Sequence, residues 1–182
     1  MKTLVIGLGN PILGDDGVGW KVAEEVEKRL AGGGWQMADG NTPSAISHQL
    51  SATSHQPSAI EVDCLSLGGL SLMERLTGYE RVILVDSMFT GKKPIGSVIT
   101  FALDSLPDLT AGHSASAHDT SLRNALNVGR SMNLPLPTDD QVQVVAIEAQ
   151  NVYDFSQELT PAVAAALPQA VDAVLDLLRT TV

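Results

Sequence analysis

The sequence predicts an α/β fold, a three-layer structure in which a mostly parallel, twisted sheet of about five strands is flanked by helices. Short apolar runs bounded by turn residues alternate with helical patterns along most of the 182 residues, and this order is typical of a largely parallel sheet. Hydrophobic residues make up 44% of the chain and charged residues 18%, so a domain of this size can bury a large core. We therefore expect one α/β domain over residues 1–182.

Five apolar runs are expected to form the strands. The run at residues 97–103 alternates like a half-buried strand, which suggests an antiparallel edge. The run at residues 141–148 alternates first and then becomes continuously apolar. The expected strands are Leu4–Ile6, Ala59–Leu65, Arg81–Asp86, Ser97–Leu103 and Gln141–Glu148.

Helical patterns lie between these strands. From Asp15 to Leu30 an apolar residue recurs every fourth position, which predicts an amphipathic helix packed on the sheet. A closing helix is expected from Thr160-Pro161, with Thr160 as a good cap and proline in the first turn. Pro168 should kink or divide that helix.

The segment 31–58 has no periodicity and is rich in Gly, Ser, Gln, Ala and His. We expect a long, flexible surface insertion, because structureless loops of this length are either functional or disordered. His48 and His55 lie within it and are expected to be solvated polar residues, since no other ligand type stands nearby at a metal-binding spacing.

Charge and cysteine content exclude several classes of protein. Lys+Arg 11 against Asp+Glu 21 gives a formal net charge of -10, which disfavours nucleic acid as a partner. The single Cys64 cannot form an internal disulfide, and no secretory cleavage pattern follows Met1, so the expected compartment is the cytoplasm. No apolar run approaches the ~20 residues of a membrane helix, so no membrane insertion is expected. Cys64 itself is expected to be a small buried residue.

Acidic side chains close three of the expected strands, namely Asp63, Asp86 and Glu148. Ligands of an open α/β sheet bind outside the carboxyl ends of its strands, so we expect these acids to share one rim with the loop at residues 7–17. Asp15 and Asp16 stand at the start of the first helix, where capping explains one of them but does not need both. A divalent cation would relieve the repulsion among these carboxylates.

Two imidazoles, His113 and His118, stand just before a helical pattern that begins near Leu122. One neutral imidazole with two carboxylates suits Ni, Zn, Mn or Fe, and the sequence does not choose among them. A loop or capping role is the alternative for either histidine. Familiar catalytic motifs are absent: Ile12 replaces the third glycine of a dinucleotide fingerprint, and neither H-E-x-x-H nor G-x-S-x-G occurs.

The first loop, Gly7-Leu8-Gly9-Asn10-Pro11-Ile12-Leu13-Gly14-Asp15-Asp16-Gly17-Val18-Gly19, resembles the opening signature of the hydrogenase maturation proteases. These endopeptidases trim the C-terminus of nickel–iron hydrogenase large subunits. Ile83–Asp86, Ser116–Asp119 and Ala146–Glu148 agree in order and spacing. The resemblance implies a phosphorylase/hydrolase-like sheet and, as partner, a hydrogenase large-subunit precursor.

The same resemblance implies that Asp16, Asp86 and His118 form a nickel-recognising and catalytic site. It implies that the nickel is supplied by the substrate, although other divalent cations could occupy the site. His113 falls outside the motif, Ala149 stands where the family often has proline, and the insertion after the first helix is larger than expected. The supporting loop and rim residues are expected to be Gly9, Asn10, Asp15, Asp63 and Glu148.

Some roles and two other functions stay open. Asp16 or Asp86 could act as the general base, and Asn10 could donate to an oxyanion or simply stabilise its turn. Gly-Leu-Gly-Asn-Pro also opens the peptidyl-tRNA hydrolases, but their Arg-His-Asn stretch and basic groove are missing, which disfavours an esterase of that kind. The second alternative is a non-catalytic nickel-binding checkpoint or assembly protein, which the same three ligands would serve.

Overall fold

The computed structural model describes residues 1–32, 60–105 and 117–180, and for residues 117–121 it describes the backbone alone. The expected insertion at residues 31–58 therefore lies almost entirely outside the described residues, as do His48, His55 and His113. The described segments contain all of the expected strands.

One five-stranded sheet, in the order β2-β1-β3-β5-β4, forms the centre of the protein. Four strands run parallel, and β4 pairs antiparallel with β5 at one edge. The mostly parallel sheet and its antiparallel edge strand confirm the fold predicted from the sequence. The strands are β1 (Thr3–Leu8), β2 (Ile60–Leu65), β3 (Arg81–Met88), β4 (Val98–Ala102) and β5 (Val142–Glu148).

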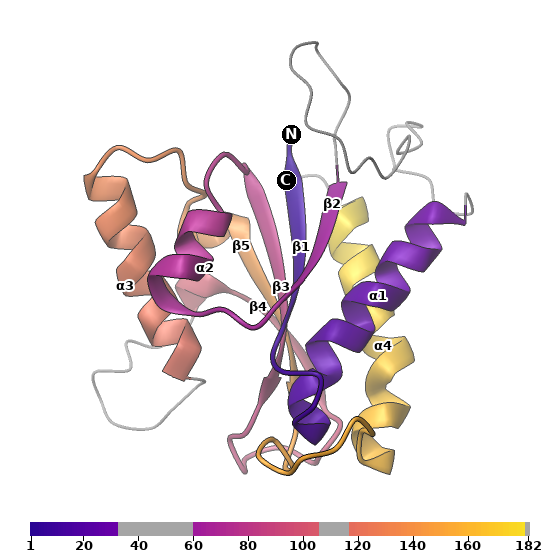
Figure 1. Cartoon of the computed structure of the whole chain (residues 1–182). Helices are drawn as coiled ribbons and strands as arrows, with labels where there is room; N and C mark the ends of the chain where they lie inside the picture. The colour runs from indigo at the N-terminus through magenta and orange to yellow at the C-terminus, as the bar shows by residue number, and fades with distance from the viewer. Residues whose placement is uncertain (33–59, 106–116, 181–182) are drawn as a thin grey trace.

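Helices cover both faces of the sheet and make the three layers (Figure 1). α1 (Val18–Ala31) and α4 (Pro161–Arg179) pack on one face, and α2 (Gly69–Arg75) and α3 (Ala117–Ser131) lie on the other. Each face has its own buried apolar cluster, because successive side chains of a strand point to opposite faces. Along β1, for example, Val5 belongs to the first cluster, and Leu4 and Ile6 belong to the second.

α1, α2 and α3 each differ from the sequence prediction. A 3-10 turn at Gly14–Gly17 precedes α1, so the α-helix begins at Val18 rather than near Asp15. α3 begins at Ala117, which places His118 in its first turn instead of before it. α2 was not predicted, because seven residues are too few for a periodic pattern to stand out.

Of the two expectations for Pro168, that it kinks or that it divides the last helix, the second is wrong, because α4 is continuous across it. A proline inside a helix leaves the carbonyl four residues earlier without its usual donor. Pro168 and Ala164 are both exposed, so water can hydrate that carbonyl and the helix can continue.

α4 is the helix that bears on the expectation that no apolar run approaches the length of a membrane helix. An 18-residue stretch of this 19-residue helix has a mean hydropathy of 1.4, so by length and composition this helix alone, among the described residues, could cross a bilayer. A core helix passes the same test, and one face of α4, including Val163, Val171 and Val174, is buried in the cluster that it shares with α1.

Candidate functional site

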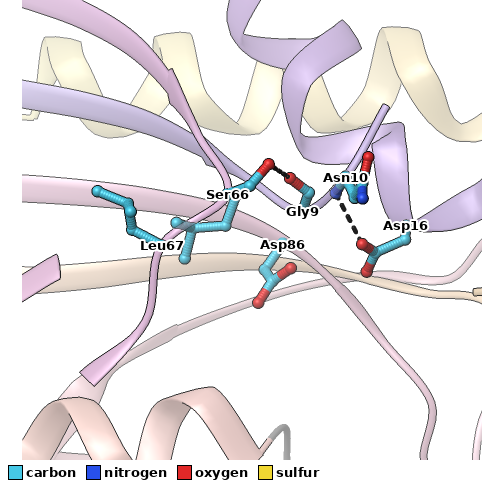
Figure 2. A pocket seen from close by; sticks show the side chains of 7 residues that line it. Gly9, Asn10, Asp16, Ser66, Leu67 and Asp86 are labelled. Atoms are coloured by element: carbon cyan, nitrogen blue, oxygen red, sulfur yellow. Dashed lines mark hydrogen bonds between the residues drawn. The ribbon is translucent and has the colours of Figure 1, made fainter. Parts of the chain in front are cut away.

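A pocket of about 210 Å³ opens at the carboxyl ends of the parallel strands, where ligands of such sheets bind (Figure 2). It brings together Asp16, from the 3-10 turn before α1, and Asp86, from β3. These are two of the three side chains expected to form the site. The pocket is lined by Leu8, Gly9, Asn10, Asp16, Ser66, Leu67 and Asp86.

Glycine makes this convergence of segments possible. Gly9 has a φ of 115°, and a Cβ there would lie 1.9 Å from the backbone oxygen of Asp16. A Cβ on Gly19 would lie 2.4 Å from the backbone oxygen of Val85. Only glycine therefore lets the first loop fold back on Asp16 while the start of α1 presses against β3, the strand that carries Asp86.

The carboxylate of Asp16 is held by donors from two segments. Its Oδ2 accepts a hydrogen bond from the backbone N–H of Asn10 at 2.7 Å, which Figure 2 shows as a dashed line, and its Oδ1 accepts one from the hydroxyl of Ser87 at 3.1 Å. Asp86 is 7% exposed and comes directly before Ser87 on β3. The two acids of the pocket are thus fixed relative to each other through β3.

Asn10 and Ser66 shape the loop around the pocket. The side-chain oxygen of Asn10 accepts a hydrogen bond from the backbone N–H of Ile12 at 3.2 Å, which is the local turn contact expected of an Asn. This contact engages the oxygen of the Asn10 amide, and its NH₂ group is a donor that an oxyanion could use. The hydroxyl of Ser66 donates to the backbone oxygen of Gly9 at 2.6 Å.

Asp15 points away from the pocket, although it is adjacent to Asp16 in the chain. It is fully buried and accepts hydrogen bonds from the backbone N–H of Asn151 at 3.3 Å and from the N–H and hydroxyl of Thr160 at 2.7 and 3.0 Å. Thr160 occupies the N-cap position of α4, but its side chain makes no capping hydrogen bond. Its hydroxyl instead joins α4 to the first loop.

Glu148 and Asp63 also have partners outside the pocket. Glu148 is fully buried and accepts hydrogen bonds from the backbone N–H groups of Thr90 and Gly91, both at 2.8 Å, and from the Thr90 hydroxyl at 2.7 Å. Asp63 pairs with Nε of Arg75 at 2.8 Å. Of the three acids expected to end strands and share a rim, Asp86 alone lines the pocket.

The ends of two strands also differ from the prediction. β2 and β3 each continue two residues beyond their acid, to Leu65 and Met88. The prediction that Asp63 and Asp86 close their strands is therefore wrong. Ser66 and Leu67, which sequence reasoning missed, follow the true end of β2, and their place directly after an apolar run is the signal that could have found them.

His118 can be placed only by its backbone. The N–H of Gly78, just before β3, donates to the backbone oxygen of Pro135, so the chain after α3 lies near the amino ends of the strands. α3 is 15 residues long, about 22 Å at 1.5 Å per residue. It begins on the side of the sheet where the strands have their carboxyl ends and runs toward their amino ends, as Figure 1 shows. The side chain of His118 is not among those that the structure describes. Among the side chains that it does describe, no group of three could hold a metal ion.

Cys64 has the properties of an unreactive thiol. It is half-buried, and its Sγ lies 3.8 Å from the backbone oxygen of Trp20, to which it donates. Burial, followed by the charges of Glu24, Asp63 and Glu27, raises the pKa of the Cys64 thiol to about 11. The thiol is therefore protonated near neutral pH and is no candidate nucleophile.

Residues 45–177 match the sequence model of a family described as hydrogenase maturation protease. The hydrogenase expression/formation protein HupD from Rhizobium leguminosarum bv. viciae is similar to the chain, with 21% identity over 178 residues that cover 98% of the chain and 74% of HupD.

Solved structures share the fold. The hydrogenase maturating endopeptidase HybD from E. coli superposes with a TM-score of 0.68 at 22% identity, covering 98% of this chain and 93% of that one. The [NiFe] hydrogenase maturation protease HybD from Thermococcus kodakarensis gives a TM-score of 0.66 at 20% identity, covering 97% and 99%. At these identities the superpositions establish a common sheet topology.

Proposed function

The chain belongs to the hydrogenase maturation protease family, and we propose from this premise that it removes the C-terminal peptide from the precursor of a nickel–iron hydrogenase large subunit. The single observation that carries the proposal to particular residues is the meeting of Asp16 and Asp86 in one pocket. We propose that these carboxylates recognise nickel already held by the precursor.

The metal-ligating groups of the pocket fit this role. Carboxylate oxygens suit divalent cations, and an imidazole would extend the set to borderline metals such as nickel. The described side chains offer two carboxylates, and the first turn of α3 brings the backbone of His118 to the same edge of the sheet. Two or three protein ligands would leave coordination positions to the precursor, as inspection of a metal bound to another protein requires.

The pocket volume supports a substrate-held metal. At about 210 Å³ it is smaller than the ~300–1,000 Å³ that is usual for a site that encloses a small molecule. It can admit a cation with the ends of a few side chains, but it cannot enclose a peptide segment. Most of the precursor must therefore lie on the surface around the pocket, and only the reacting part enters.

Hydrolysis of the peptide bond requires that water attack the carbonyl carbon, that the C–N bond break and that a proton reach the leaving amine. A substrate-held nickel can polarise the carbonyl as a Lewis acid. We propose that Asp16 or Asp86 accepts the proton of the attacking water, because both carboxylates face the pocket. The amide NH₂ of Asn10 is the proposed donor to the oxyanion.

The proposal also covers the cellular compartment of the protein and its two alternative functions. We place the protein in the cytoplasm, because its one cysteine cannot form an internal disulfide. A net charge of -10 disfavours the tRNA substrate of a peptidyl-tRNA hydrolase. The non-catalytic checkpoint differs from the protease in one observable, the cleavage of the precursor.

The test is to incubate the purified protein with its precursor, either nickel-loaded or nickel-free, and to weigh the product by mass spectrometry. We expect the mass of one C-terminal peptide to be lost from the loaded precursor alone. No mass loss with binding intact would favour the checkpoint, and release of tRNA from peptidyl-tRNA would favour the esterase. Persistent cleavage by both the Asp86→Ala and the His118→Ala variants would overturn the site assignment.

A further inference from the structure

Exposed apolar side chains gather at the edge of the sheet that carries the pocket. Nine large apolar residues are exposed among those described. Single exposed apolar residues are ordinary, but a group of them on one side marks an interaction surface. Six of the nine follow the carboxyl ends of β1, β2, β3 and β5, namely Ile12, Leu67, Leu70, Phe89, Tyr153 and Phe155.

Three of these six are aromatic. The whole chain contains only seven aromatic residues, and Phe89, Tyr153 and Phe155 are 59%, 85% and 86% exposed. Exposed aromatic side chains carry a large apolar area that is favourable to bury, and aromatic residues are enriched where protein partners bind most tightly. A chain with so few aromatics nevertheless presents three of them to solvent in the segments that follow β3 and β5.

Tyr153 and Phe155 are carried by a segment that is fixed to the first loop. The N–H of Gly14 donates to the backbone oxygen of Ser156 at 2.7 Å, and the N–H of Ser156 donates to that of Ile12 at 3.0 Å. At the other end, the N–H of Asp15 donates to the backbone oxygen of Asn151 at 2.9 Å. The segment 151–156 is thus held against the loop that contains Asp16.

Phe89 is fixed on both sides to the end of β5. The backbone oxygen of Met88 accepts a hydrogen bond from the N–H of Ala149 at 2.7 Å, and Thr90 donates two hydrogen bonds to Glu148. The chain leaves β5 at these residues and continues into the segment 151–156. The buried carboxylates of Asp15 and Glu148 therefore stabilise the two segments that carry the aromatic side chains.

We propose that Ile12, Phe89, Tyr153 and Phe155 form an aromatic platform on which an apolar segment of the protein substrate docks beside the pocket. This inference rests on the proposed function for the identity of that substrate. The small pocket supports it, because a precursor that inserts only its reacting part must be held elsewhere.

Charges around the platform define the chemistry of the segment further. Asp154 and Glu158 are exposed near the aromatic pair, and Lys92 and Lys93 are exposed just after Phe89. None of the four takes part in an ion pair with another described residue. The docking segment is apolar in its centre, basic on the side that meets Asp154 and Glu158, and acidic on the side that meets the lysines. A net charge of -10 opposes binding to an anionic membrane instead.

The test measures the kinetics of processing and the affinity for the nickel-loaded precursor with the variant Tyr153→Ser/Phe155→Ser. We expect KM and Kd to rise about tenfold or more, while kcat changes less than about threefold. The charge variant Asp154→Lys/Glu158→Lys should also raise Kd, and it should reduce the dependence of Kd on salt concentration. The matched control is Met132→Ser, which removes an apolar residue that is 67% exposed after α3, and it should change neither KM nor Kd.

An unchanged KM and Kd in the aromatic variant would overturn the platform while the proposed function stands. If the wild-type protein binds the precursor without cleaving it, the proposed function fails and the Kd values still test the platform. If the aromatic variant changes only the sedimentation coefficient of the protein, the surface binds a second copy of the chain. A change confined to binding of phosphatidylserine vesicles would assign it to a membrane, and either result overturns the proposal.

Discussion

The carboxylate of Asp15 accepts hydrogen bonds from both the backbone N–H and the hydroxyl of Thr160, 145 residues further along the chain. Asp16, the next residue, instead faces the pocket and is held by Asn10 and Ser87. Two adjacent carboxylates thus have opposite surroundings. One joins the first loop to α4, and the other is available to a ligand.

Asp15→Ala should destabilise the fold. The substitution removes a fully buried carboxylate and leaves the N–H and hydroxyl of the partly buried Thr160 without their acceptor. We expect a loss of about 3 kcal/mol in the free energy of unfolding, since hydrogen bonds to charged groups contribute about 1.5–3 kcal/mol each. Urea denaturation followed by circular dichroism measures it. A loss below about 1 kcal/mol would show that water or another group replaces the carboxylate.

Asp16→Asn should lower activity while leaving stability nearly unchanged. The side-chain oxygen of Asn can still accept the hydrogen bond from the N–H of Asn10, so stability should change by less than about 1 kcal/mol. Loss of the negative charge should lower kcat/KM for the nickel-loaded precursor by about a hundredfold or more, as expected for a catalytic or metal-binding carboxylate. Normal processing by this variant would remove Asp16 from the site.

Two substitutions of Glu148 test how much its buried carboxylate stabilises the loop after β3. Glu148→Gln keeps an oxygen that can accept from Thr90 and Gly91, whereas Glu148→Ala leaves both N–H groups and the Thr90 hydroxyl without an acceptor. We expect the Ala variant to lose about 2 kcal/mol more stability than the Gln variant. It should also raise KM for the precursor, because Phe89 lies in the loop that Glu148 holds. Equal stabilities of the two variants would contradict this role.

Glu61 should contribute a pH-dependent stability. Burial by itself raises its pKa, but hydrogen bonds from Tyr79 and Arg75 and the charges of Arg75 and Lys2 together hold it below its ordinary value of 4.5. A carboxyl whose pKa is lowered by folding stabilises the native state above the unfolded-state pKa, and this contribution is lost as the pH falls through the folded-state pKa.

Glu61→Gln should therefore cost stability at pH 7, by less than about 1 kcal/mol because the side chain is half exposed. The difference from the wild-type protein should shrink as the pH falls below 4.5. Urea denaturation at several pH values provides the measurement. A difference that grows as the pH falls would contradict the assigned ion pair with Arg75.

Cys64 should react slowly with alkylating reagents. With a pKa of about 11, about one thiol in a thousand is ionised at pH 8, and the thiolate is the reactive form. The alkylation rate should rise about tenfold per pH unit over the range in which the fold is intact. Cys64→Ser should process the precursor normally, and loss of activity in that variant would show a role for the thiol that its surroundings do not suggest.

The apolar patterns of the strands and long helices could be predicted from the sequence because the apolar side chains of the sheet and helices pack into two buried clusters. The exact ends of strands carry no such signal. Asp63 and Asp86 resemble strand-ending residues, yet β2 and β3 continue through them because their backbones still have neighbours to pair with. α2 is too short to show a period.

That the first loop and Asp86 share one rim could be predicted from the sheet architecture, whereas the choice of Asp16 as the partner of Asp86 came from the family resemblance. The glycines at 9 and 19 make their meeting in one pocket sterically possible. The sequence could not show which acids turn inward. Asp15 and Glu148 look like rim carboxylates, but their partners, Thr160 and Thr90, lie on distant or later segments. Long-range hydrogen bonds of this kind leave no local pattern.

The most direct test of the central claim, that Asp16 and Asp86 recognise a metal carried by the substrate, is the affinity for the nickel-loaded precursor relative to the nickel-free one. Calorimetry with the wild-type protein, Asp16→Asn and Asp86→Asn measures this ratio. The account predicts that the wild-type protein prefers the loaded precursor by about tenfold or more, about 1.4 kcal/mol, and that each variant loses most of the preference. Equal preference in all three proteins would contradict it.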